Sequence, residues 1–236
     1  MDKIIRDAQL KLLKIFSGAS KTFALSGGTA LELYYLKHRF SRDLDFFSPT
    51  YNLKEINSLI SKFNEAAGGT IKLENQFTAP NKARVRFYAV EIKGTAFPLK
   101  IDFIEDVFFD RPDIRKFNKI PVYDVNNIYF QKIIALVGTN LVRDRTGREV
   151  TTGRGEARDI IDIYYLSKKV NPLHKFMKNL VKEHQRGVVH WYRSYSRQEV
   201  KLGVFDLDIY DKYFDVAKMI TYLDKEIREF MSEITR

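Results

Sequence analysis

Apolar residues recur at helical spacing in two segments of the N-terminal half. In residues 2–16 they form a stripe between lysines and an aspartate, made of Ile4, Ile5, Ala8, Leu12, Ile15 and Phe16. The second segment starts at Asn52, with Glu55 three residues later as in a capping box, and keeps the same spacing to Phe63. We therefore predict two amphipathic helices.

The period changes to two between residues 70 and 105. Three segments alternate apolar and polar residues and are joined by short turns: TIKLENQF, ARVRFYAVEI and FPLKIDFIE. Alternation favours half-buried strands, and short connections favour antiparallel pairing of neighbours. We predict three consecutive antiparallel strands, added to an earlier strand around residues 43–47.

Helical spacing returns after Tyr123. Asp124 is suited to cap a helix that extends to Val137, and a final helix is predicted over Asp208–Ile234. Residues 108–121 contain two prolines and mixed charge, which indicates a loop with a connecting strand. Residues 142–158 carry three glycines and five arginines, which predicts a mobile basic loop.

The change of pattern near residue 120 suggests two domains. At 236 residues the chain is long enough for one large domain or two modest ones. We predict an α/β (α+β) domain at residues 1–120 and a mainly helical domain at residues 121–236.

Charge and aromatic content bear on the partner. The net charge is +10, which favours a polyanion such as nucleic acid, although a basic surface also keeps lysine-rich proteins in solution. Residues 168–201 hold much of this surplus, interleaved with Phe176, Trp191, Tyr192 and Tyr195. Cations mixed with aromatic rings bind unpaired RNA bases, and the alternative is that the rings form the core of a helical bundle.

The composition argues against a metal–thiolate site and against a membrane protein. The chain has no cysteine, which is compatible with a reducing cytoplasm. His174, His184 and His190 lack partnering cysteines and tight ligand spacing, so no metal site is expected among them. No apolar run approaches the roughly 18 to 20 residues that span a bilayer, so no membrane partner is expected.

A small-residue turn follows the apolar residues Phe23–Leu25. Ser26-Gly27-Gly28-Thr29 leads into apolar residues at helical spacing. Paired glycines let backbone N–H groups approach an anion, and Thr29 is suited to cap the following helix, whose N-terminal end favours negative charge. The turn therefore predicts a phosphate-binding site, and a plain reversal of the chain is the alternative.

Three carboxylates complete the candidate chemistry. In the strand around residues 43–47, Asp43 and Asp45 share one face, and Asp102 lies on the polar face of the strand that ends at Glu105. Clustered carboxylates repel one another unless a cation lies between them, and such oxygen ligands suit Mg²⁺. The alternative is that all three are ordinary solvated strand residues.

These motifs resemble a known superfamily. Gly27-Gly28-Thr29, thirteen further residues, Asp43-x-Asp45 and a later strand carboxylate are similar to polymerase-β-type nucleotidyltransferases. More closely, GGTALELYYLKHRFSRDLDFF resembles the AbiEii/AbiGii-type nucleotidyltransferase toxins. The matching positions of the family pattern are His38, Arg39, Ser41, Asp43, Asp45 and Phe46.

The resemblance implies a fold and a reaction. It implies a polymerase-β-like domain with a mixed sheet, followed by a helical domain. The reaction would transfer NMP from an NTP to an acceptor hydroxyl, with Mg²⁺, or alternatively Mn²⁺, as cofactor. The triphosphate would bind Gly27, Gly28 and Thr29, and the metal would bind Asp43, Asp45 and Asp102. The implied acceptor is the 3′ end of tRNA, and the implied protein partner is a cognate antitoxin in a cytoplasmic toxin–antitoxin or abortive-infection pair.

The resemblance also points to the helical domain. Lys132 matches the family's helix lysine and would contact the triphosphate, whereas the residue pattern alone indicates a solvated lysine. Asp159, in the Arg-Asp-x-x-Asp segment that starts at Arg158, would orient Lys132 or act as a general base, with Asp162 as structural support. The family often has an arginine about two turns after the lysine. Here the arginines come later, as Arg143 and Arg145, so the corresponding residue is open.

Two other functions remain compatible with the sequence. A small-molecule or protein nucleotidyltransferase would keep the metal site and have no use for a basic aromatic surface. A non-catalytic RNA-binding protein would keep the basic surface without NTP affinity.

Overall fold

The structure is a computed structural model that describes residues 2–67, 70–78, 83–138, 140–143 and 149–234. The chain forms two compact units. The first comprises Met1–Tyr35 and Phe40–Ile128, and the second comprises Leu36–Arg39 and Tyr129–Arg236. The chain therefore enters the second unit briefly at Leu36–Arg39 before it returns to the first.

The elements of the first unit follow in chain order. They are α1 (Lys3–Ala19), β1 (Ala24–Ser26), α2 (Gly27–Ala30), β2 (Leu44–Ser48), α3 (Leu53–Ala67), β3 (Ile71–Phe77), β4 (Val85–Val90), β5 (Leu99–Glu105), β6 (Ile114–Phe117) and β7 (Ile120–Tyr123). A π-helix, Leu31–Leu36, continues directly from α2. The helix α4 (Val125–Val137) starts in this unit and continues in the second.

The described strands of the first unit form a seven-stranded mixed sheet. Their order is β3-β4-β5-β2-β1-β7-β6. The pairs β2–β5 and β1–β7 are parallel, and the remaining neighbours are antiparallel. The predicted antiparallel run from β3 to β5, added to the strand that follows Asp43, is confirmed, as is the mixed sheet.

The region predicted as a loop with a connecting strand contains a hairpin. β6 and β7 pair antiparallel through a tight turn at Asn118 and Lys119, whose φ angles are 49° and 70°. Both central residues of a type I′ turn require positive φ, which suits the twist of a two-residue hairpin. Pro121 in β7 and the exposed, charged residues of the edge strand β6 hid this hairpin from the sequence pattern, because proline is depleted in strands and the charges interrupt the alternation.

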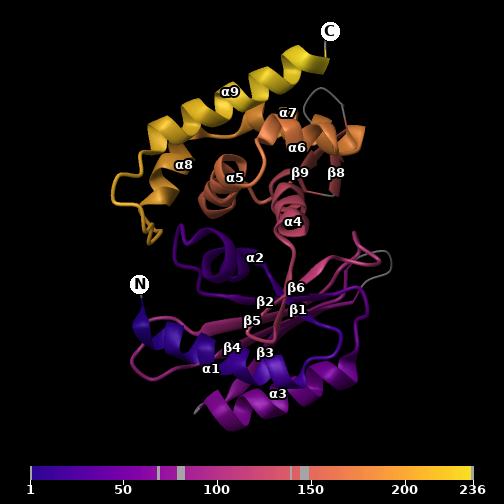
Figure 1. The fold of residues 1–236 in the computed structure, drawn as a ribbon, viewed down its shortest axis with the longest axis vertical. Helices are drawn as coiled ribbons and strands as arrows, with labels where there is room; N and C mark the ends of the chain where they lie inside the picture. Colours follow the sequence, from indigo (N-terminus) through magenta and orange to yellow (C-terminus); the bar gives the residue numbers. More distant parts are fainter. Residues whose placement is uncertain (1, 68–69, 79–82, 139, 144–148, 235–236) are drawn as a thin grey trace. The chain divides into compact units, whose positions relative to one another are not determined.

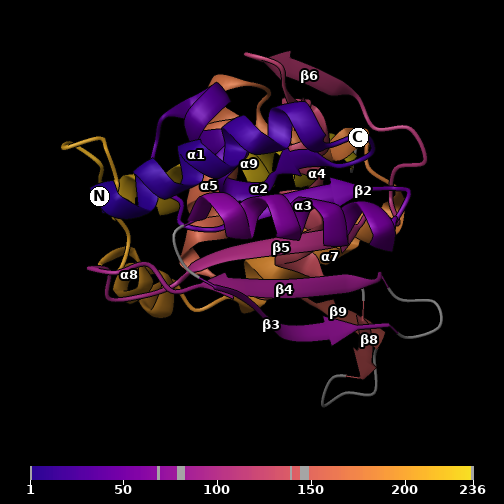
Figure 2. The same ribbon diagram turned by 90° about the horizontal axis from the view of Figure 1, so that it is seen from below.

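The helices α1 and α3 cover one face of the sheet (Figures 1 and 2). Phe16 of α1 stacks on Phe46 of β2, with ring centroids 4.1 Å apart, and Phe46 also contacts Phe63 of α3 and Phe103 of β5. Leu44, Phe46, Ile101 and Phe103 are all fully buried. Since side chains alternate along a strand, the residues between them lie on the opposite face.

Both predicted N-terminal helices begin at a side-chain cap. Asp2 accepts hydrogen bonds from the backbone N–H groups of Ile4 and Ile5, and Asn52 accepts from those of Lys54 and Glu55. The Glu55 side chain does not complete a capping box. It instead accepts hydrogen bonds from the backbone of Lys21 and Thr22, and so stabilises the connection between α1 and β1.

The second unit is mainly helical. Its elements after α4 are β8 (Asn140–Arg143), β9 (Glu149–Thr152), α5 (Ala157–Lys169), α6 (Leu173–Lys178), α7 (Lys182–Ser194), α8 (Arg197–Val204) and α9 (Val216–Ile234). The long helix α9 packs against α5, α6, α7 and α8 (Figure 1). Among the described residues, no helix has the length and hydropathy to cross a membrane.

Two predictions in this unit were wrong. The final helix begins at Val216 rather than Asp208, because Asp215 caps it by accepting hydrogen bonds from the backbone N–H groups of Ala217 and Lys218. The region 142–158 is also not a continuous loop. β8 and β9 pair antiparallel there, while residues 144–148 of the predicted loop lie outside the described residues.

We expect Phe46→Ala to lower the free energy of unfolding by about 3–5 kcal/mol, because the deletion leaves a cavity among three aromatic rings. Urea denaturation of the full chain measures the loss. The control is Leu10→Ala on α1, where the side chain is 48% exposed, and its expected cost is below about 1 kcal/mol. Equal losses in the two variants would contradict the packing described here.

Candidate active site

The glycine turn lies directly beside a carboxylate. β1 ends at Ser26, and Gly27 starts the helical segment with a φ of +67°. A Cβ atom at this position would lie 2.0 Å from Oδ2 of Asp45, far inside van der Waals contact. Position 27 therefore requires glycine for two reasons, its left-handed backbone and its close approach to Asp45.

Two of the three predicted carboxylates are neighbours in the sheet. Asp45 of β2 and Asp102 of β5 are register partners in a parallel pair, on strands that lie about 4.8 Å apart. Both are half-buried. Since Phe46 next to Asp45 packs on α1 and α3, the alternation of side chains puts Asp45, and Asp102 beside it, on the opposite face. Asp43 precedes the first residue of β2 and is also half-buried. The structure thus brings Asp45 and Asp102 together and places Asp43 two residues upstream.

Buried side chains hold the segment Ser41–Asp43 that leads into β2. Thr29 donates a hydrogen bond through Oγ1 to the carbonyl oxygen of Asp43. Gln9, which is fully buried, donates through Nε2 to the carbonyl oxygen of Ser41 at 3.0 Å. Glu32 accepts from the backbone N–H of Ser41 at 2.7 Å. The position of Asp43 is therefore fixed through its backbone.

The prediction that Thr29 caps the helix was wrong. The N-cap of α2 is Ser26, and its side chain makes no capping hydrogen bond. Thr29 is fully buried and reaches across to the backbone of the segment Ser41–Asp43. Its hydroxyl is used within the protein, so the groups of this turn that suit an anion are backbone N–H groups.

A second cluster of charged side chains lies within the second unit. Lys132 of α4 places its Nζ 2.8 Å from Oδ1 of Asp159 and 2.8 Å from Oδ2 of Asp162, both on α5. The two aspartates are completely buried, and Lys132 is 7% exposed. Lys132 is thus not the solvated surface residue that its pattern alone indicated.

Asp162 also binds the short segment Leu36–Arg39. Arg39 donates to both of its carboxylate oxygens, from Nε to Oδ1 at 2.7 Å and from Nη2 to Oδ2 at 2.8 Å. Nε2 of His38 lies 2.7 Å from Oδ1. The sequence analysis placed His38 and Arg39 in the family pattern but gave them no role. Their place in the family pattern was the available signal.

The cluster holds its carboxylates ionised. Burial alone would raise the pKa of Asp162, but Arg39 and Lys132 outweigh it and hold that pKa well below its usual range. Burial likewise opposes the charge of Lys132, yet the two aspartates raise the pKa of the lysine. Burial lowers the pKa of His38 despite its bond to Asp162, so this imidazole is neutral at pH 7.

Asp159 is poorly suited to act as a base. Burial would raise its pKa, but Lys132 and Arg154 lower it overall. A carboxylate with a lowered pKa accepts a proton weakly at neutral pH. The arrangement therefore favours the alternative in which Asp159 orients Lys132.

Arg154 is an arginine that the sequence analysis did not single out. Its side chain is 52% exposed, and its Nη2 lies 3.3 Å from Oδ2 of Asp159. Of the two arginines considered from the sequence, Arg143 lies on β8 and Arg145 lies outside the described residues. Arg154 therefore contacts Asp159 of the cluster, in addition to Arg39, which binds Asp162.

Comparison with known proteins extends these observations. Residues 11–233 match the family model of the nucleotidyl transferase AbiEii toxin of type IV toxin–antitoxin systems. No curated protein matches the chain significantly. A candidate nucleotidyltransferase from H. pylori is 18% identical, with 100% of this chain and 97% of that chain covered and a TM-score of 0.59. JHP933 from Helicobacter pylori is 18% identical, with 100% and 96% covered and a TM-score of 0.54. At this identity the likeness shows a shared fold.

We expect Gly27→Ala to destabilise the first unit, by about 1–2 kcal/mol for the left-handed backbone and by more for the overlap with Asp45. The matched control is Gly155→Ala, at a φ of +62° with no atom within 4 Å of the added Cβ. Urea denaturation of the two variants separates backbone strain from the overlap. Equal losses would show that Gly27 does not approach Asp45 this closely.

We expect Asp162→Asn to lower the free energy of unfolding by about 3–5 kcal/mol at pH 7, because Arg39 and Lys132 lose a buried counter-charge. The control is Glu105→Gln, which breaks a partly exposed pair with Arg84 and is expected to cost about 1 kcal/mol or less.

The same variant has a defined pH dependence. The folded pKa of Asp162 is lowered, so its contribution is present above the unfolded pKa of about 3.9 and is lost as the pH falls through the folded value. The stability difference between wild type and Asp162→Asn should therefore narrow below about pH 3.9. A difference that stays constant into acid would contradict the ionised buried carboxylate.

Proposed function

Because the chain belongs to the AbiEii nucleotidyltransferase toxin family, we propose that it transfers a nucleoside monophosphate from an NTP to an acceptor hydroxyl. The observation that carries this proposal is the register pairing of Asp45 and Asp102, directly beside the Gly27 turn. The acceptor oxygen forms a bond to the α-phosphorus of the NTP. The bond from that phosphorus to the bridging oxygen breaks, and pyrophosphate leaves while the hydroxyl proton passes to solvent.

The carboxylates fit a divalent metal. The donor set of Asp43, Asp45 and Asp102 is purely oxygen, which is the ligand type that Mg²⁺ prefers, with Mn²⁺ as an alternative. Because Gly27 has no Cβ, the carboxylate of Asp45 can lie directly against the turn that is proposed to bind phosphate. When bound, the metal neutralises charge on the phosphoryl group and makes the acceptor hydroxyl easier to deprotonate.

The turn after β1 suits the triphosphate. The N–H groups of Gly27 and Gly28 lie at the start of a helical segment that continues through the π-helix to Leu36. Such an end favours negative charge, and glycine lets the backbone approach a phosphate closely. Thr29 keeps the turn in place through its bond to the backbone of Asp43. We assign the nucleotide to this turn.

Lys132 is proposed to steady the charge of the phosphates. Its ammonium group has three N–H donors, and two of them face Asp159 and Asp162. The third can bind an anion, while the aspartates fix its direction. Connectivity along the chain supports this role. Arg39 belongs to the same cluster as Lys132, and only three residues separate it from Asp43. The competing role for Lys132 is purely structural.

The proposal of an RNA acceptor depends on positive charge more than on stacking of bases on aromatic rings. Trp191 and Tyr192 are buried, so these two rings form part of the helical core, which was the alternative to RNA stacking. A groove of about 660 Å³ along α7 and α9 carries three cations, Lys182, Arg186 and Arg193. It supports the binding of RNA phosphates, and tRNA as the acceptor rests on the family resemblance. The type IV toxin–antitoxin family likewise supports a cognate antitoxin as partner.

The test incubates the purified full chain with Mg²⁺, each α-³²P-labelled NTP in turn and total cellular RNA. We expect label on tRNA-sized RNA, and we expect Asp45→Asn and Asp102→Asn each to lower the rate by about 10²-fold or more. The matched control, Asp110→Asn, removes an exposed aspartate of the same unit and should keep full activity.

Each outcome separates the alternatives. Label on a protein or a small molecule overturns the RNA acceptor and leaves the transfer chemistry intact. Activity that survives Asp45→Asn overturns the assigned metal site. For Lys132, a structural role predicts that Lys132→Arg loses stability with an unchanged KM for the NTP, whereas phosphate contact predicts a raised KM.

A further inference from the structure

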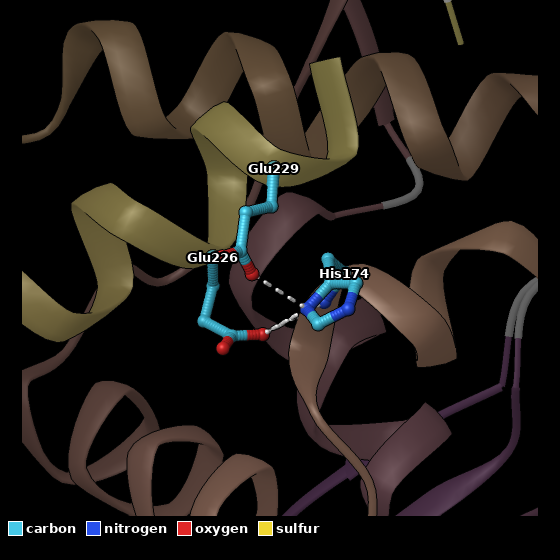
Figure 3. A group of neighbouring side chains, drawn as sticks. All are labelled: His174, Glu226 and Glu229. Atoms are coloured by element: carbon cyan, nitrogen blue, oxygen red, sulfur yellow. Dashed lines mark hydrogen bonds and ion pairs between the residues drawn. The ribbon is translucent and has the colours of Figure 1, made fainter. Parts of the chain in front are cut away.

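A histidine and two glutamates of the second unit converge on one another (Figure 3). His174 lies in the first turn of α6, and Glu226 and Glu229 lie one turn apart on α9. Nδ1 of His174 is 2.8 Å from Oε2 of Glu226 and 3.3 Å from Oε2 of Glu229. One ligand atom from each residue lies within 4.8 Å of the other two, the only such group found among the described residues.

The surroundings hold these ligands in place. Glu226 is buried, and its Oε2 also accepts a hydrogen bond from the backbone N–H of His174 at 3.0 Å. The side chain of Tyr222 hydrogen-bonds to Glu226 and also lies 2.9 Å from Oγ of Ser167. A carboxylate fixed by outer hydrogen bonds is typical of protein metal ligands. Glu226 is therefore preorganised toward the imidazole.

We propose that His174, Glu226 and Glu229 bind a divalent transition-metal ion of the Zn²⁺ class. Ligand atoms at about 2.0–2.2 Å from such an ion lie roughly 3 to 3.5 Å apart. The distance from Nδ1 to Glu229, 3.3 Å, lies in this range, and the 2.8 Å to Glu226 is a hydrogen-bond distance that would lengthen slightly around an ion. An imidazole nitrogen favours Zn²⁺ or Co²⁺ over Mg²⁺, so this site is chemically distinct from the all-oxygen set of Asp43, Asp45 and Asp102.

The position of the site suggests what the ion does. Glu229 is 40% exposed on its side chain, which leaves room for water to complete the coordination. The three ligands join α6 to α9, two helices whose ligands are separated by 52 residues in the chain. The ion thus crosslinks the helical unit. The histidines gave no such indication from sequence spacing, because both partners come from a distant helix.

A protonated imidazole is the competing explanation. His174 as a cation forms two ion pairs with the same glutamates, and the metal takes the place of its Nδ1 proton. The two explanations differ in one measurable property: a metal site binds the ion tightly, whereas an ion pair predicts no specific metal binding.

The experiment titrates the metal-free full chain with ZnCl₂ by calorimetry and with CoCl₂ by visible absorption, in excess MgCl₂. We expect one ion per chain, bound at micromolar concentration or tighter, and about a 10- to 100-fold loss of affinity in both His174→Ala and Glu229→Gln. Glu229→Gln alters a partly exposed position and keeps the test valid if His174→Ala does not fold. His190→Ala, in the groove along α7 and α9, is the control and should bind normally.

Two results would overturn the site. One is the absence of binding tighter than about 100 μM, and the other is equal affinity in wild type and in Glu229→Gln. Binding that is lost in Asp45→Asn and kept in Glu229→Gln would assign the ion to the carboxylates of the sheet instead. The outcome is independent of the nucleotidyl transfer, since neither titration uses an NTP.

Discussion

The packing of the second unit depends on the ion pairs and hydrogen bonds of the buried Asp162 carboxylate. This carboxylate binds Arg39 and His38 from the segment Leu36–Arg39 and Lys132 from α4, so three separate parts of the chain meet at one group. A buried carboxylate is tolerated only when its charge is balanced and its oxygens are hydrogen-bonded, and here both conditions are met. The charge balance in turn requires Asp159 as the counter-charge of Lys132.

A second constraint governs the first unit, where backbone and carboxylate approach each other closely. Gly27 leaves space for Asp45, Asp45 pairs in register with Asp102, and Thr29 fixes the backbone of Asp43. Three buried side chains, Gln9 on α1, Thr29 on α2 and Glu32 on the π-helix, hold the backbone that leads into the polar face of the sheet. The fold therefore separates stability, carried by the aromatic face under α1 and α3, from the polar face that we propose binds metal and nucleotide.

Local periodicity was enough to predict the elements whose burial is regular. The alternation of Asp45 with Phe46, and of Asp102 with Phe103, correctly predicted carboxylates on a polar strand face. It could not show that β6 and β7 form a hairpin, because Pro121 and exposed charges break the pattern. Nor could it reveal the roles of Gln9, Arg39 and Glu226, whose partners lie tens of residues away and meet only in the folded chain.

The most direct test of the account is a crystal structure of the wild-type chain with Mg²⁺ and an NTP analogue whose α,β-bridging oxygen is replaced by methylene, so that it cannot react. The account predicts a metal ion bound by Asp45 and Asp102, with the triphosphate against the backbone N–H groups of Gly27 and Gly28. An analogue bound elsewhere, or a metal held without either carboxylate, would contradict it.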